Sequence, residues 1–110
     1  MPGLFSLPLV FGILRLMILD FNGPIFYWRG PSPYWFVAVP PEQSEAIKLL
    51  AGQVSYGWGC IPVRARLGST EWKTSLFPKD GRYLVPIRVS VQRAENLALD
   101  DWVDLQLEIG

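Results

Sequence analysis

Basic side chains recur at alternating positions in the middle of the chain, a spacing that places them on one face of neighbouring strands. They are Arg64, Arg66, Lys73 and Arg88. Such a face can bind an anion or a phosphate backbone. The alternative is a solvated sheet face on which the cations pair with Glu71, Asp104 or Glu108 across strands. The formal net charge is zero, so we favour the solvated face.

A second group of side chains surrounds the end of a predicted strand, where a ligand site would gather hydroxyl, ammonium and aromatic groups. Its members are Trp58, Thr74, Ser75, Lys79 and Arg82. Hydroxyls beside a lysine can hold an anion, and loops at the mouth of a barrel commonly carry sites. Thr and Ser are also ordinary strand residues, and a turn would leave Lys79 in water. We take these five residues as the candidate ligand-binding surface.

Much catalytic and metal chemistry is excluded by composition. The sequence contains no histidine and a single cysteine, Cys60. Catalysis by Ser-His-Asp or Cys-His arrangements is therefore impossible, and the chain lacks a zinc ligand set. We expect a non-catalytic protein with no cofactor and no metal. An enzyme of unrecognised type that uses Lys79 is the weakest alternative.

The elements that must position these residues are mostly strands. Residues 60–89 read as three short strands with period-two alternation, joined by turns at Gly68-Ser69 and Pro78–Gly81. Val85 and Leu105 belong to alternating apolar rows that would face a core. The remaining elements are a strand over 17–28 interrupted at 22–24, a strand over 34–39, a helix over 42–52, a short helix over 90–96 and a strand over 102–109.

A length of 110 residues indicates one domain with a modest core. We expect residues 17–110 to form it and residues 1–16 to be an N-terminal extension outside the fold. The extension is apolar but interrupted by Pro2, Pro8, Gly12 and Arg15, which disfavours a membrane span. We therefore expect a cytoplasmic protein without membrane contact, as a monomer or a weak homodimer.

Several separated motifs occur in the order typical of one family. The motifs are Tyr34-Trp35-Phe36-Val37 with Pro40, Ile61-Pro62-Val63, the run from Thr74 to Lys79, and Gly81, Tyr83, Leu84 and Pro86. In these motifs the chain resembles domain of unknown function family nineteen-oh-five, a set of small bacterial and archaeal proteins. The resemblance covers about residues 17–110. Asp100-Asp101 departs from the family, which usually has Gly-Asp before its last strand.

The resemblance implies a fold but no established activity. It implies a double-split β-barrel of about six strands capped by one or two short helices. Within it, the segment from Gly81 to Leu97 is similar to AbrB-type swapped-hairpin DNA-binding domains. We favour a binding or accessory module for an unidentified small molecule or protein partner. The alternative is a nucleic-acid-binding regulator that uses the four basic residues, and zero net charge counts against it.

Overall fold

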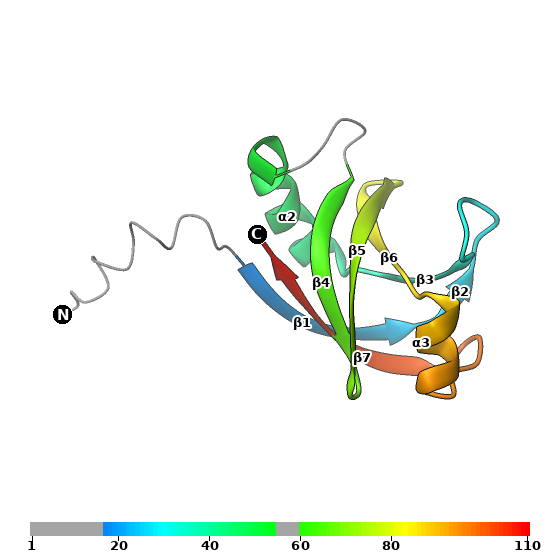
Figure 1. Ribbon diagram of the computed structural model, residues 1–110. Coiled ribbons are helices and arrows are strands. Elements are labelled where there is room, and N and C mark those ends of the chain that lie inside the picture. The colour runs from blue at the N-terminus through cyan, green and yellow to red at the C-terminus, as the bar shows by residue number, and fades with distance from the viewer. Residues whose placement is uncertain (1–16, 55–59) are drawn as a thin grey trace.

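The computed structural model (Figure 1) describes residues 17–54 and 60–110, which form seven strands and two helices. The strands are β1 (Met17–Pro24), β2 (Phe26–Tyr27), β3 (Trp35–Ala38), β4 (Ile61–Leu67), β5 (Thr70–Lys79), β6 (Arg82–Pro86) and β7 (Trp102–Ile109). The helices are α2 (Pro41–Val54) and α3 (Val89–Ala94). The predicted mostly β fold with small helices is confirmed.

The strands form one antiparallel sheet in the order β1-β7-β4-β5-β6-β3-β2, which curls into a barrel-like shape (Figure 1). Two-residue turns connect β4 to β5 and β5 to β6. The turn at Gly68-Ser69 lies where the sequence predicts it, whereas the second turn is shorter than the predicted Pro78–Gly81 because Pro78 and Lys79 stay paired with β6. Gly68 has a φ of 62°, and Asp80 and Gly81 have φ values of 51° and 80°. Asp-Gly with two positive φ angles is a favoured hairpin turn because its twist matches that of the strands. These turns bring β4, β5 and β6 side by side.

The first strand turns a corner at Ile25. The sequence predicts an interruption at residues 22–24, but β1 continues through Pro24 and the break falls one residue later. Pro24 stays in register because it lies opposite Trp102 at the end of the ladder. The fully buried Ile25 then exchanges backbone hydrogen bonds with Asp100 and Asp101, at 2.8 and 2.9 Å. As a result, one continuous segment pairs with β7 on one side of the corner and with β3 on the other.

The core lies on the concave face of the sheet and follows the predicted alternation. The buried positions of β4 and β7 are Ile61, Val63, Ala65, Leu67, Val103, Leu105, Leu107 and Ile109. Val85 and Ile87 from the β6 region are fully buried in the same cluster. The apolar rows therefore meet in one core, and the predicted strand phase is correct.

Helix α2 is longer than the predicted 42–52 and packs against β4 and β6. Its buried Ser44 fixes the contact: the hydroxyl donates to the carbonyl of Val39 and accepts from the backbone N–H of Tyr83, at 3.1 and 3.2 Å. Helix α3 is shorter than predicted and follows β6 directly. Among the residues that the structure describes, no helix is both long enough and apolar enough to cross a membrane.

A second apolar layer lies on the outer face of β3 and β6. Phe36 and Leu84 are buried there, outside the main core cluster. The segment after β2 folds over this layer, with the ring centroid of Trp28 5.3 Å from that of Phe36. Gly30 lies against the Trp28 indole, since a Cβ at Gly30 would come within 2.6 Å of the ring. Trp28 therefore anchors the start of the segment between β2 and β3 to the outer face of the sheet.

Candidate functional site

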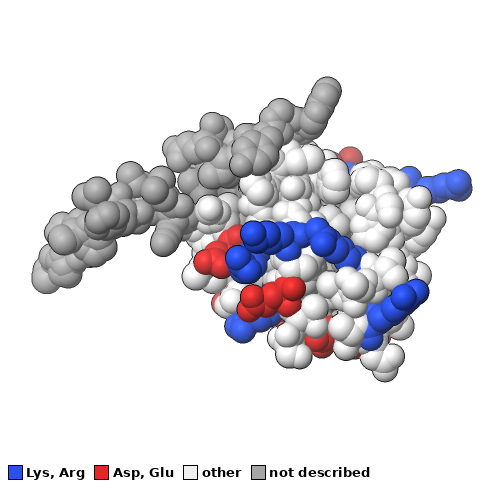
Figure 2. Space-filling model, viewed as in Figure 1, with Lys and Arg blue, Asp and Glu red and all other residues white. Residues whose placement is uncertain are grey.

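The two basic residues of β4 lie in ion pairs on the outer face of the sheet. Arg64 lies 3.9 Å from Glu71 and 3.7 Å from Glu108, and Arg66 lies 4.0 Å from Glu71. All four side chains are half exposed, so each pair is weak. Figure 2 shows basic and acidic side chains next to each other on the viewed face. This part of the sheet therefore carries balanced charge.

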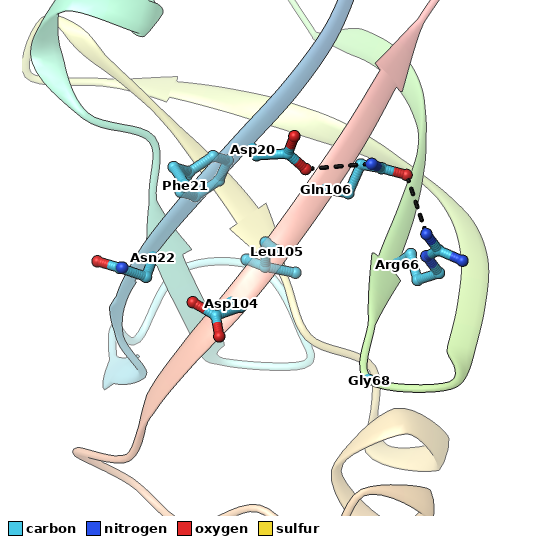
Figure 3. A pocket seen from close by; sticks show the side chains of 8 residues that line it. All are labelled: Asp20, Phe21, Asn22, Arg66, Gly68, Asp104, Leu105 and Gln106. Atoms are coloured by element: carbon cyan, nitrogen blue, oxygen red, sulfur yellow. Dashed lines mark hydrogen bonds between the residues drawn. The ribbon is translucent and has the colours of Figure 1, made fainter.

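One open groove, the β1–β7 groove, lies over the middle of β1 and β7 and the end of β4, and has a volume of about 610 Å³. Its lining is Asp20, Phe21, Asn22, Arg66, Gly68, Asp104, Leu105 and Gln106. Figure 3 shows Gln106 between two partners: its amide donates to Asp20 at 3.1 Å and accepts from Arg66 at 3.5 Å. The polar groups at the centre of this groove thus hydrogen-bond one another across β1, β7 and β4. We interpret these hydrogen bonds between Asp20, Gln106 and Arg66 as contacts that stabilise the sheet.

A second groove, the β5–α3 groove, has a volume of about 600 Å³ and a different composition. It is lined by the middle of β5, by the connection from β6 to α3 and by the tip of the segment between β2 and β3. The residues are Ser32, Pro33, Lys73, Thr74, Ser75, Phe77, Pro86, Arg88 and Val89. Among the residues that the structure describes, this lining contains two cations and no carboxylate. This is the charge pattern of an anion site.

The two cations of the β5–α3 groove are tied together through the backbone. The Arg88 guanidinium donates to the carbonyl of Lys73. Arg88 also stands immediately before the first turn of α3, so the helix start fixes its backbone. Because a guanidinium has five N–H donors, this bond leaves several donors for a ligand. The Lys73 ammonium has no carboxylate within 4.0 Å among the residues that the structure describes.

The predicted ligand-binding surface is divided by the structure. Thr74 and Ser75 line the β5–α3 groove. Lys79 lies four residues further along β5, about 13 Å away by strand rise, opposite Arg82. Trp58 lies outside the described residues. Of the alternative basic set, Lys73 and Arg88 line this groove, whereas Arg64 and Arg66 lie in the ion pairs described above. The groove therefore unites one part of each predicted set.

Lys79 and Arg82 have their own partners at the end of the β5–β6 hairpin. The Lys79 ammonium lies 2.8 Å from Asp80 and 5.1 Å from the ring centroid of Trp28. The Arg82 guanidinium donates to the carbonyl of Val39 at 3.0 Å. Both side chains thus connect the hairpin to neighbouring segments.

The groove wall supplied by the segment between β2 and β3 was not predicted as part of a site. The sequence indicates only a turn over residues 29–33, yet Ser32 and Pro33 border the groove. The next residue, Tyr34, has a φ of 71°, which is strained for a bulky side chain. Strained backbone is concentrated at functional sites. The aromatic residues on both sides of this turn could have indicated that it contributes to the groove, because aromatic side chains can pack a loop against a sheet.

Comparison with known proteins agrees with this fold and gives no activity. A family model described as a domain of unknown function (DUF1905) matches residues 21–107. The chain belongs to the DUF1905 family. The predicted resemblance is confirmed, and the match covers the whole barrel-like sheet except the ends of β1 and β7. A search of curated proteins found no match. Among the described residues, no cluster of three His, Cys, Asp or Glu side chains could hold a metal ion.

Proposed function

We propose that this DUF1905 domain is a non-catalytic binding module that takes a small anionic molecule in the β5–α3 groove. The observation that carries the proposal is that the described part of the lining has Lys73 and Arg88 and lacks a carboxylate. Charge-assisted hydrogen bonds from ammonium and guanidinium groups are the strong contacts available to an anion. Ser75 lies two residues from Lys73 on the same face of β5, so its hydroxyl adds a neutral donor.

A like-charge pair across the β4–β5 ladder supports the proposal. Lys73 lies directly opposite Arg64 in the β4–β5 ladder. Like charges in such cross-strand pairs are destabilising. The carboxylates that offset Arg64, those of Glu71 and Glu108, lie at 3.9 and 3.7 Å from it. A bound anion at Lys73 would offset the second charge, so binding and folding would reinforce each other.

The nucleic-acid alternative receives less support from the geometry. It needs a row of available cations, but Arg64 and Arg66 are paired with Glu71 and Glu108. A duplex follows a long positive surface, whereas the β5–α3 groove offers two cations. An enzyme using Lys79 is also disfavoured, because that ammonium contacts Asp80 and Trp28.

We further propose that the sheet is a double-split barrel and that the protein acts in the bacterial cytoplasm as a monomer or a weak homodimer. The barrel proposal is supported by the segment from β1 to β2, which pairs with both β7 and β3 and so joins the two ends of the strand order. The charge-balanced outer face agrees with a solvated location.

The test is a titration of the ¹⁵N-labelled chain with sodium phosphate, followed by NMR, against sodium chloride of equal ionic strength. We expect saturable shifts at the amides of residues 73–77 and 87–89. Lys73→Met keeps the aliphatic stem and removes the charge. It should weaken phosphate binding about tenfold or more, because a hydrogen bond to a charged group contributes about 1.5–3 kcal/mol.

Lys48→Met on the exposed face of α2 is the matched control and should bind as the wild type does. A wild-type spectrum that changes equally with phosphate and chloride would overturn the proposal. Equal phosphate affinity in the Lys73→Met variant would overturn the assignment to this groove.

A further inference from the structure

The β5–α3 groove also has apolar lining residues. Pro33, Phe77, Pro86 and Val89 line it together with the polar residues. Val89 is 46% exposed although it is a large aliphatic residue. An apolar side chain left open beside a concavity is typical of ligand pockets, which combine apolar walls with a few polar anchors.

The apolar residues of the groove are held by neighbouring strands of the sheet. Phe77 lies opposite the buried Leu84 in the β5–β6 ladder, and Pro86 lies opposite the fully buried Phe36 in the β3–β6 ladder. The segment between β2 and β3, which contains Pro33, is closed by a hydrogen bond from the backbone N–H of Trp28 to the carbonyl of Tyr34, at 2.9 Å. The groove is thus preformed, and a ligand would not have to order it.

A simple inorganic anion would use only part of this groove. The volume of about 600 Å³ lies within the range that holds drug-sized organic ligands. Phe77 is a half-buried aromatic residue of the lining, and aromatic rings pack favourably on one another. We infer, on the basis of the proposed anion site, that the ligand carries an aromatic body attached to its anionic group. Lys73 and Arg88 contact the anionic head, and Phe77, Pro86 and Val89 contact the body.

The experiment compares pairs of probes that share a head and differ in the body. Phenyl phosphate is titrated against methyl phosphate, and benzoate against acetate, using the same NMR shifts. We expect the aromatic member of at least one pair to bind about tenfold more tightly, since burying a ring removes apolar area from water. The pair with the larger gain identifies the head as phosphate or carboxylate.

Val89→Ser and Phe77→Ala should reduce the affinity for the aromatic probe severalfold and leave the affinity for methyl phosphate or acetate unchanged. Val89→Ser is the safer variant because Val89 is partly exposed in the native fold. If neither aromatic probe gains over its partner, the inference is wrong while the anion site stands. If no probe of either pair binds, the proposed function itself fails.

Discussion

Asp100 occupies a backbone conformation that glycine adopts more easily. Its φ is 75°, in the left-handed region where a Cβ approaches the neighbouring carbonyl oxygen. The family resemblance leads us to expect glycine at this place, and the positive φ agrees with that expectation. The turn nonetheless stays tight, because the Asp100 N–H donates to the Ile25 carbonyl at 2.8 Å. Asp100 therefore has a strained backbone in a corner whose hydrogen bonds are intact.

Asp100→Gly should raise the free energy of unfolding by about 0.5–1 kcal/mol, because release of the left-handed strain exceeds the added entropy of the unfolded chain. Urea denaturation measures the change. Asp101→Gly should act in the opposite direction, since the Asp101 carboxylate accepts a 2.8 Å hydrogen bond from the Ala98 N–H. Destabilisation by both substitutions would contradict this account of Asp100.

Burial raises the pKa of the Tyr83 phenol above its ordinary value of 10.0, and the charge of Glu45 raises it further. The folded chain therefore holds this proton more tightly than the unfolded chain does. This contribution to stability is complete below pH 10 and is lost as the pH rises through the elevated pKa. Tyr83→Phe should show a shallower loss of stability between pH 10 and 12 in urea melts. Superimposable slopes for the two proteins would exclude the effect.

Helix α3 is locked to the β4–β5 hairpin by one carboxylate. Glu95, just after the helix, accepts hydrogen bonds from the Thr70 hydroxyl and from the Ser69 N–H. The same carboxylate fills the space beside Gly68, where a Cβ would collide with it. This contact fixes the helix that places Arg88 at the β5–α3 groove.

A double-mutant cycle with Glu95→Ala and Thr70→Val should give a coupling energy of about 1 kcal/mol, the value of a partly exposed hydrogen bond. Chemical denaturation of the four proteins measures it. Glu71→Ala, which removes only exposed ion pairs, should change stability by less than about 0.5 kcal/mol. Additive single effects would mean that Glu95 and Thr70 act independently.

Regular elements were predictable because their signals are local. Alternation in β4 and β7 follows from side-chain geometry, and the turns at Gly68 and at Asp80-Gly81 follow from their φ requirements. The corner at Ile25 was misplaced by one residue, because it depends on backbone bonds to Asp100 and Asp101 far away in the sequence.

The barrel-like sheet depends on one consistent strand phase. Leu105 is 2% exposed on the concave face, so Leu105→Asp would bury an unpaired charge and should unfold the domain. Trp102→Asp, at a 70% exposed position of the same strand, should leave it folded. Circular dichroism melting compares the two variants. A cooperatively melting Leu105→Asp protein would show that the phase is wrong.

The β5–α3 groove was only half predictable, since it forms where three distant segments meet. Thr74, Ser75, Lys73 and Arg88 were recognisable by type and spacing. The sequence could not indicate which cations lack a nearby carboxylate, because the ion pairs depend on the pairing of β4 with both β5 and β7. The contribution of Ser32 and Pro33 depends on how Trp28 packs on Phe36, which no local pattern encodes.

The position of β7 has a consequence for synthesis. It lies between β1 and β4, and Met17 of the first strand pairs with Ile109 at its far end. On the ribosome, which adds about 5–20 residues per second, β1 emerges first and waits for the last strand of the sheet. Until then its row of Met17, Leu19 and Phe21 has no partner strand, and β4 has only one. A nascent chain that stalls before β7 would expose two strand edges at once, and chaperones should recognise it at that stage.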